Sequence, residues 1–181
     1  MRIIAGAWRG RPLLAPPGQA TRPTSDRARE GLFSMLASRL GSFEGLEVAD
    51  LFAGTGALGL EALSRGAAHC TFVERDRAAI EALKRNIDAL GATDRAEVRA
   101  APAEHAAPPR GPCDLVLLDP PYRSGLAGPV LERLAAGAWL APAAWISVEL
   151  SGEALAFPRA LVLEAERRFG RAVIHLLRHR R

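Results

Sequence analysis

From residue 46 to residue 150 the chain alternates short apolar segments with helical ones, and this alternation constrains the fold more than any other feature. Each apolar segment has the length of a β-strand, and the helical segments carry apolar residues every three or four positions. The strands are predicted at residues 46–52, 70–73, 97–100, 113–118 and 144–150, and the helices at 57–65, 77–90 and 126–136. This order predicts an α/β fold with a mostly parallel sheet and helices on both faces.

The two ends of the chain extend this α/β unit. Residues 161–169 and 171–178 are predicted to form two strands that turn at Gly170, which completes a seven-stranded sheet with an antiparallel edge. Residues 1–23 are rich in Gly, Pro and Arg and predict a small β-hairpin or an irregular arm. Thr24, Ser25 and Asp26 offer capping side chains for a helix that ends at Gly41. We therefore expect an N-terminal arm and helix over 1–45 and the main domain over 46–181, joined in one compact unit.

Length and composition fit one cytoplasmic domain. The 181 residues are 49% hydrophobic, which is enough for one sizeable core. The apolar runs stay far below the roughly 20 residues that span a bilayer, and the N-terminus has no apolar stretch typical of a signal peptide. Cys70 and Cys113 are too few for a disulfide framework, and the four histidines lack metal-ligand spacing. We expect neither a membrane nor a metal as partner.

Charge is segregated along the chain. Residues 1–45 hold seven arginines against three acids, and residues 167–181 hold six arginines and no acid. The segment 46–166 carries 11 basic and 17 acidic residues. Arginine suits phosphate groups and stacks on bases, so basic ends around an acidic centre indicate a surface for a polyanion such as nucleic acid. A genome rich in Arg codons is the alternative, and it explains the excess of Arg over Lys but not the segregation.

A glycine-rich turn follows the first strand of the main domain. Gly54, Gly56 and Gly59 form G-x-G-x-x-G between a strand and a helix, where backbone can approach a ligand. Glu74 follows 20 residues after Gly54, at the end of the second strand, where an acid can bind both hydroxyls of an adenosine ribose. NAD and S-adenosylmethionine both satisfy this pattern. Asp50, just before the turn, suits a cationic sulfonium and would repel a pyrophosphate, which favours S-adenosylmethionine.

The second motif, Asp-Pro-Pro-Tyr at residues 119–122, ends the buried strand 113–118. The lone pair of an exocyclic base amine is delocalised into the ring, so the nitrogen is a poor nucleophile. Asp119 and the rigidly placed carbonyl of Pro120 can accept its two N–H bonds and aim the lone pair at a methyl group. Tyr122 offers a flat face for an unstacked base. The motif therefore predicts methylation of a nucleobase amine.

Three segments together resemble the bacterial RsmD family, whose members methylate guanine N2 in 16S ribosomal RNA. They are Arg-Ile-Ile-Ala-Gly-Ala-Trp-Arg-Gly-Arg at 2–11, Arg-Pro-Thr-Ser-Asp-Arg-Ala-Arg-Glu-Gly-Leu-Phe at 22–33, and the segment 50–66 that begins Asp-Leu-Phe-Ala-Gly-Thr-Gly. The resemblance runs from residue 2 to about residue 150. It implies a Rossmann-like S-adenosylmethionine-dependent methyltransferase fold, and a monomer that acts on ribosomal RNA within a small-subunit assembly particle.

The resemblance also implies roles for single residues. The residues that would face the donor are Asp50, Ala53, Gly54 and Gly56 at its methionine end, Glu74 at its ribose, and Ala101, Pro102 and Ala103 beside its adenine. Holding the guanine are Asp119, Pro120, Pro121 and Tyr122. The residues that would contact RNA are Trp8, Arg9, Arg11, Arg22, Arg27 and Arg29. Trp8 could equally pack the arm against the domain, and Thr24 could instead contact the donor. Residues 101–103 have no polar side chain, so adenine contacts are expected from backbone, and the arm is expected to lie outside the donor site.

Three other functions are compatible with parts of this pattern. A DNA adenine or cytosine amino-methyltransferase shares Asp-Pro-Pro-Tyr, but such enzymes usually carry a further target-recognition domain. An NAD-dependent oxidoreductase shares the glycine turn but leaves residues 119–122 without a role. A non-catalytic RNA-binding assembly factor would need no intact donor site.

Overall fold

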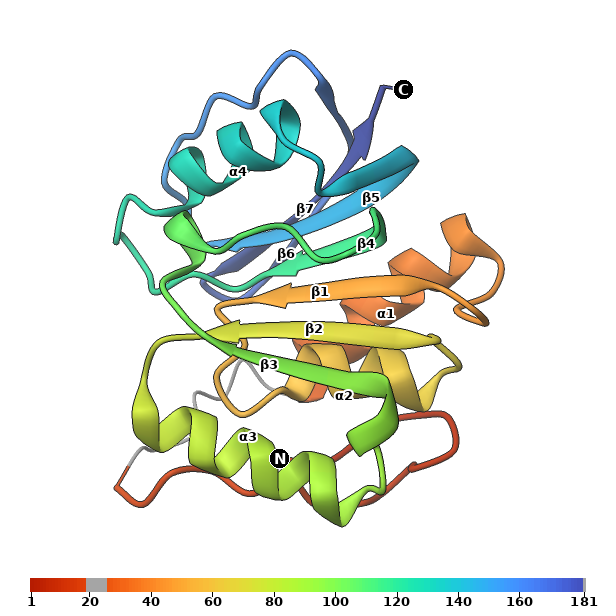
Figure 1. The fold of residues 1–181 in the computed structure, drawn as a ribbon. Helices are drawn as coiled ribbons and strands as arrows, with labels where there is room; N and C mark the ends of the chain where they lie inside the picture. Colours follow the sequence, from red (N-terminus) through yellow and green to blue (C-terminus); the bar gives the residue numbers. More distant parts are fainter. Residues whose placement is uncertain (19–25, 181) are drawn as a thin grey trace.

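The computed structural model describes residues 1–18 and 26–180, and its centre is a seven-stranded sheet (Figure 1). The order across the sheet is β3-β2-β1-β4-β5-β7-β6. The strands are β1 (Glu47–Leu51), β2 (His69–Glu74), β3 (Ala96–Ala100), β4 (Cys113–Leu118), β5 (Leu140–Leu150), β6 (Leu161–Phe169) and β7 (Ala172–His179). The first five are parallel, and β7 runs antiparallel to both β5 and β6. The predicted fold class, including the antiparallel edge, is confirmed.

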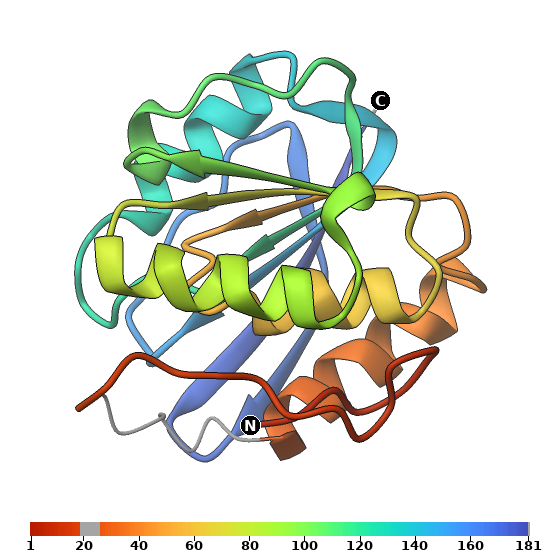
Figure 2. The same cartoon turned by 60° about the horizontal axis from the view of Figure 1, so that its bottom comes forward.

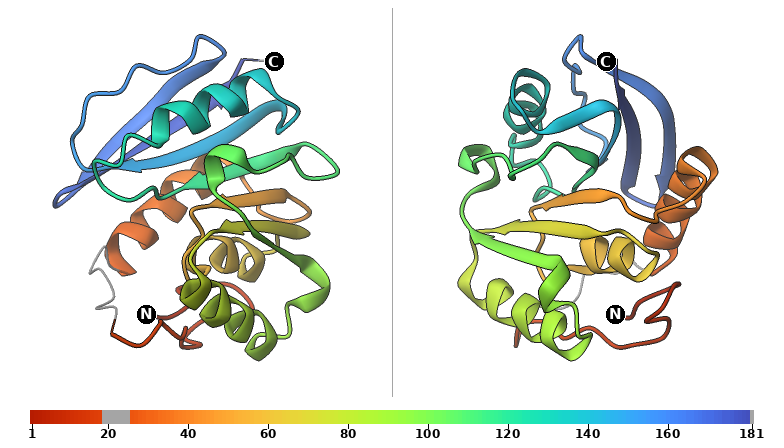
Figure 3. Two further views of the ribbon diagram at one scale, coloured as in Figure 1. Left: turned by 60° about the vertical axis from the view of Figure 1, so that its left-hand side comes forward. Right: turned by 45° about the vertical axis from the view of Figure 1, so that its right-hand side comes forward.

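Helices cover both faces of the sheet (Figure 3). They are α1 (Asp26–Leu40), α2 (Ala57–Ser64), α3 (Arg77–Ala89) and α4 (Ala127–Ala136). On β4, Leu115 and Leu117 share a core with α1, α2 and α3, whereas Val116 and Leu118 share a second core with α4. This division explains the unbroken apolar run in β4, because a strand covered on both faces has no side exposed to water.

One strand differs from its predicted extent. β5 begins at Leu140, four residues earlier than predicted, and its pairing with β4 shifts register between Leu140 and Trp145. Pro142 cannot donate a backbone hydrogen bond and Ala143 has a φ of 59°, so this part of the strand bulges.

Asp76 caps α3 as expected, because its side chain accepts a 2.8 Å hydrogen bond from the Ala79 N–H. The predicted capping residues Thr24 and Ser25 lie outside the described residues.

Residues 1–18 form a packed arm that crosses the helices on the α1–α3 face (Figure 2). A hairpin-like loop closes through Ile3 N–H to the Arg11 carbonyl at 2.9 Å and Gly10 N–H to the Ile3 carbonyl at 2.8 Å. Ile3 is fully buried and Leu13 nearly so, and both belong to the core of α1, α2 and α3. The arm is thus ordered by burial and shares its core with the main domain.

Three polar side chains attach the arm to α2 and α3. Glu61 is fully buried and accepts hydrogen bonds from the backbone N–H groups of Ile4 (2.8 Å) and Ala5 (3.0 Å). Ser64 donates to the Ala5 carbonyl at 2.6 Å. Asn86 bonds both the N–H and the carbonyl of Leu14 and also donates to the carbonyl of Thr55, at 3.0 Å, in the glycine-rich turn. The arm is therefore connected to the turn through one buried amide.

Within the described ranges, no helix is long and apolar enough to cross a membrane.

Candidate active site

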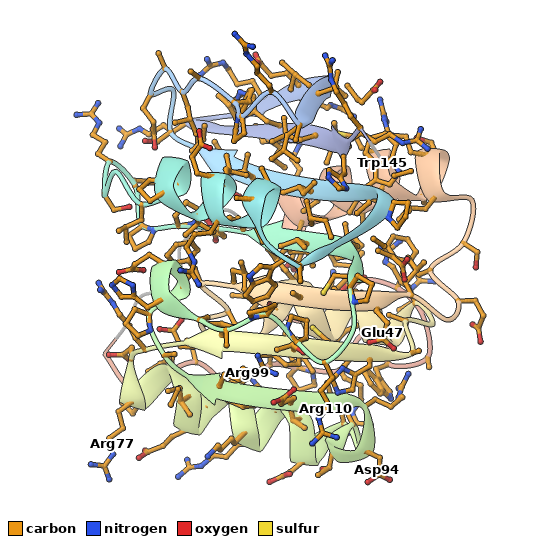
Figure 4. All side chains as sticks on the ribbon, turned by 45° about the horizontal axis from the view of Figure 1, so that its top comes forward. Glu47, Arg77, Asp94, Arg99, Arg110 and Trp145 are labelled. Carbon is orange, nitrogen blue, oxygen red and sulfur yellow. The ribbon has the colours of Figure 1, made fainter. Side chains whose placement is uncertain are left out.

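Four neighbouring parallel strands each carry an acid at or near the carboxyl end. Across the sheet in the order β2, β1, β4 and β5, these acids are Glu74, Asp50, Asp119 and Glu149. The carboxyl ends of parallel strands meet at one edge, which is where open α/β sheets bind ligands. In Figure 4 this edge lies on the left with Arg77, at the start of α3, whereas Glu47 and Asp94 lie at the opposite edge, where the strands begin.

A cavity of about 520 Å³ opens at the carboxyl edge. Of the residues assigned to donor or base from sequence, those that line it are Asp50, Ala53, Gly54, Glu74, Ala101, Ala103, Asp119 and Pro121. Gly56, Pro102, Pro120 and Tyr122 are not part of its lining. The structure thus gathers at one cavity residues that lie up to 71 positions apart in the chain, from Asp50 to Pro121.

The three glycines of the turn serve different purposes. Gly54 has a φ of 56°, and a Cβ there would meet no atom within 4 Å, so the backbone is open toward the cavity. A Cβ at Gly56 would lie 2.4 Å from Leu83, and one at Gly59 would lie 2.4 Å from the Phe72 ring. Gly54 therefore allows close approach of a ligand, whereas Gly56 and Gly59 allow α2 to pack tightly on its neighbours.

Carboxylates of the chain itself occupy backbone donors at this turn. Glu74 accepts hydrogen bonds from the N–H groups of Gly54, Arg75 and Asp76, each at 2.8 Å. Asp50 accepts one from the N–H of Gly59 at 2.9 Å. Pyrophosphate cofactors need such donors at the helix N-terminus, and here two of them are already bonded to negative groups. The site therefore fits a ligand with a cationic end better than NAD.

Burial raises the pKa of Asp50 well above its usual value, and the nearby carboxylates of Asp119 and Glu74 raise it further. The hydrogen bond from Gly59 acts in the opposite direction and lowers it. Asp50 is only 1% exposed, so its charge is poorly solvated in the free protein. A cationic ligand in the cavity would favour the charged form.

Asp50→Asn is therefore expected to stabilise the free protein at pH 8 while weakening donor binding. The folded-state pKa of Asp50 lies above its unfolded value, so ionisation costs the folded protein stability as pH rises from about 4 through the folded pKa. Asparagine removes that cost, about 1 kcal/mol for each pKa unit, and keeps an oxygen for Gly59. Denaturant unfolding should show a gain at pH 8 that vanishes near pH 4, and calorimetry should show roughly tenfold weaker donor affinity. Asp94→Asn, at the exposed opposite edge, should show neither effect, and a destabilised Asp50→Asn at pH 8 would contradict the argument.

Part of the cavity wall is formed by residues that were not predicted from the sequence. Glu104, in the short 3-10 turn Ala103–His105, lines the cavity next to Ala101 and Ala103, so a polar side chain lies near the expected adenine site after all. Met1, Ala15 and Pro16 also line the cavity. The packed arm therefore returns to the carboxyl edge and supplies one wall of this cavity, whereas it was expected to lie away from the predicted donor residues.

Asp119 stands between this cavity and a second one of about 110 Å³. Besides Asp119, the second cavity is bounded by the start of the arm, α1, the start of α2, and the strands β5 and β7. Its lining residues there are Met1, Ala28, Arg29, Leu32, Ala57, Leu58, Glu149 and Ile174. Tyr122 is half-buried, and its hydroxyl donates a 2.9 Å hydrogen bond to the Glu149 carboxylate. The motif 119–122 therefore has the large cavity on one side of its acid and the small cavity on the other.

The arginines assigned to RNA are dispersed. Trp8, Arg9 and Arg11 belong to the loop that packs on the ends of α2 and α3, where Ser64 bonds the Trp8 N–H and Arg11 bonds the Ala89 carbonyl. These ends face the edge where the strands begin, opposite the cavities. Arg95 covers the Trp8 ring at 5.0 Å, which favours packing over base stacking for this residue.

The remaining three arginines of that set differ in exposure. Arg27 is exposed on the first turn of α1, and Arg22 lies outside the described residues. Arg29 is only 5% exposed, and its guanidinium bonds the Arg2 carbonyl and Asp26. A phosphate contact by Arg29 is therefore ruled out by its burial, although its side chain borders the second cavity.

A group of exposed arginines does lie beside the cavities, at the turn between β6 and β7. Because Glu149 pairs with Ile174 and Leu150 with Val173, β7 starts beside the carboxyl end of β5. Arg167, Arg168 and Arg171 flank this turn and are exposed. A Cβ at Gly31 would lie 2.2 Å from the Phe169 ring, so the first half of α1, with Arg27, packs close to the turn. We refer to Arg27, Arg167, Arg168 and Arg171 as the basic rim.

The described residues hold no group of three or more His, Cys, Asp or Glu arranged to bind a metal ion.

The chain matches one family model and is similar to several known proteins. A family model described as "conserved hypothetical protein 95" matches residues 1–178. The ribosomal RNA small subunit methyltransferase D of Escherichia coli K12 is 44% identical over 149 residues, which cover 82% of this chain and 74% of that protein. The protein of the same name from Haemophilus influenzae is 40% identical over 153 residues, covering 82% and 78%. The solved structure of the Escherichia coli protein yhhF is similar with a TM-score of 0.87 at 40% identity, covering 99% of this chain and 97% of that one.

Proposed function

Because this chain belongs to the conserved hypothetical protein 95 family, that is, the RsmD family of S-adenosylmethionine-dependent methyltransferases, we propose that it methylates the exocyclic N2 of a guanine in small-subunit ribosomal RNA. One observation carries the proposal. Asp119 lies in the wall shared by the donor-sized cavity and the smaller cavity, so an amine held there faces a methyl donor. The family relatives named as ribosomal RNA small subunit methyltransferase D support the RNA substrate.

The charged and polar groups that line the large cavity suit S-adenosylmethionine. Bound S-adenosylmethionine would supply an electrophilic methyl group on a cationic sulfur. Glu74 would bind the ribose hydroxyls with the lone pairs left by its three backbone bonds. Glu104 would accept a hydrogen bond from the adenine amino group, and Asp50 and Gly54 would border the methionine end of the donor. Negative charge from Asp50, Glu74 and Asp119 favours a cation at the centre of the cavity.

The motif 119–122 would prepare the amine for attack. The Asp119 carboxylate would accept one N–H and turn the nitrogen lone pair toward the large cavity. As the new C–N bond forms, the nitrogen becomes cationic, and the same carboxylate would stabilise it and take the surplus proton. Pro120 is buried and Pro121 borders the cavity, so the backbone after Asp119 is held in extended form. Tyr122 would support the flipped base from its position beside Glu149.

We propose that the basic rim, rather than the arm loop, binds the RNA backbone near the base to be modified. Each phosphate contact releases condensed counterion, so affinity falls with salt. Replacing Arg167 and Arg168 with alanine should therefore flatten the log–log salt slope of RNA binding by about one to two units. The matched control replaces Arg9 and Arg11, which lie at the opposite edge, and should leave the slope nearly unchanged. The reverse result, measured by filter binding at several salt concentrations, would place the RNA on the arm.

The proposed activity is tested with labelled S-adenosylmethionine and 16S ribosomal RNA from cells that lack the modification. Nucleoside digestion should yield N2-methylguanosine at one position. Label on adenine N6 or cytosine N4, or on DNA alone, would support the alternative amino-methyltransferase, and no transfer despite RNA binding would support the assembly factor. Naked RNA and partly assembled small subunits should be compared, since we propose that a monomer acts on the assembling particle.

A further inference from the structure

The small cavity carries a charged group that the motif 119–122 does not include. Leu118 and Val148 are paired across β4 and β5, so Asp119 and Glu149 follow side by side at the carboxyl edge. Both border the small cavity. One oxygen of Glu149 accepts the Tyr122 hydroxyl at 2.9 Å, which fixes the carboxylate next to the base-holding motif. A second hydrogen-bond acceptor thus stands beside Asp119 at the wall of this cavity.

The opposite wall of the small cavity is apolar apart from Arg29. Arg29 borders the small cavity from α1 and is 5% exposed. Its Nη2 group bonds the Arg2 carbonyl and Asp26, while Nε and Nη1 are buried without a hydrogen-bond partner among the described residues. Both nitrogens have almost no exposed surface, so a ligand in the cavity does not reach them, and the charged groups that face a ligand there are on the Asp119 and Glu149 side.

Two neighbouring hydrogen-bond acceptors, Asp119 and Glu149, complement the hydrogen-bond donors of one nucleobase. Guanine presents an oxygen acceptor at O6, a donor at N1–H and two donors on the N2 amine. Adenine and cytosine, which carry amines that the same four-residue motif can hold, have an acceptor nitrogen next to the amine instead. We propose that Glu149 selects guanine by accepting N1–H beside the amine held by Asp119. The proposal rests on the proposed function and names the residue that restricts its base.

The contact with Glu149 would reject the other two bases. An acceptor nitrogen opposite the Glu149 carboxylate leaves two lone pairs facing each other in a site that excludes water. A site built around a substrate N–H discriminates strongly against analogues that lack it, because its own buried group is then left unpaired. The motif 119–122 alone provides no such discrimination, because it contacts only the exocyclic amine, which all three bases carry.

The test uses RNA in which the mapped guanine is replaced by 2,6-diaminopurine. This base keeps the 2-amino group but has a lone pair at N1 and an amine in place of O6. Wild-type protein should prefer guanine in kcat/KM by roughly tenfold to a hundredfold. Glu149→Gln keeps an acceptor for Tyr122 and gains an amide donor for N1, so the preference should fall by about tenfold or more. Glu164→Gln, the same change at an exposed position of β6, should leave both rates unchanged.

Tyr122→Phe distinguishes recognition of the base by Glu149 from support of the base ring by Tyr122. If Glu149 reads N1–H, Tyr122→Phe should lower both rates together and keep the preference for guanine. An unchanged preference in Glu149→Gln, or equal use of both bases by the wild type, would overturn the inference. Wild-type protein that forms no N2-methylguanosine at all would instead overturn the proposed function, so the two failures are distinguishable.

Discussion

Replacing Asp119 with alanine is expected to lower kcat by roughly 10²- to 10⁴-fold while RNA affinity changes less than about threefold. Asp119 lies in the wall between the two cavities, where the amine nitrogen would gain positive charge as its new bond forms. Its carboxylate would therefore interact more strongly with the transition state than with the bound base. RNA affinity depends mainly on phosphate contacts, and the basic rim that would make them is formed by other residues.

Asp119→Asn refines this result. Asparagine can still accept an N–H through its carbonyl, but it cannot take a proton and adds no negative charge. If Asp119 only positions the amine, the asparagine variant should retain most of the activity that alanine loses; if it also stabilises the charge, both variants should be nearly inactive. Asp94→Ala, at the exposed opposite edge, is the matched control and should keep wild-type turnover. A loss of activity that saturating RNA restores in Asp119→Ala would argue against the proposed role.

The parts of the fold that were predictable from sequence are those with local signals. The Asp76 cap of α3, the end of α1 at Gly41 and the apolar run of β4 each depend on a few neighbouring residues, and all three were confirmed. The glycine turn and the motif 119–122 are likewise contiguous. The carboxyl-edge position of both follows from strand order alone, because parallel strands bring their ends together.

What sequence reasoning missed depends on contacts between distant residues. Ile4 and Glu61 are 57 positions apart, and Leu14 and Asn86 are 72 apart, so no local pattern indicates that the arm is held on α2 and α3. The same long-range packing buries Arg29, which is indistinguishable from Arg27 in the sequence. Glu149 is also invisible in sequence, because an acid at the end of a strand gains meaning only when its neighbour across the sheet is Asp119.

Gly6→Ala is expected to destabilise the protein by about 3–5 kcal/mol, far more than the same change at Gly10. Both glycines have positive φ, 86° and 82°, so alanine meets similar backbone strain at each, about 1–2 kcal/mol. They differ in their surroundings. A Cβ at Gly6 would lie 1.9 Å from the Ser64 carbonyl oxygen, whereas one at Gly10 would meet nothing within 4 Å.

Relief of that clash requires the arm loop to leave α2. The buried carboxylate of Glu61 would then lose its bonds from Ile4 and Ala5, and Ile3 would lose its buried position. Met1, Ala15 and Pro16 line the large cavity that we propose binds the donor. Displacement of the arm should therefore also weaken binding of S-adenosylhomocysteine by roughly tenfold or more, although Gly6 itself does not line that cavity. Denaturant unfolding and calorimetry measure the two effects. Equal stability and equal ligand affinity for the two alanine variants would show that the arm is neither anchored through this contact nor needed for the donor site.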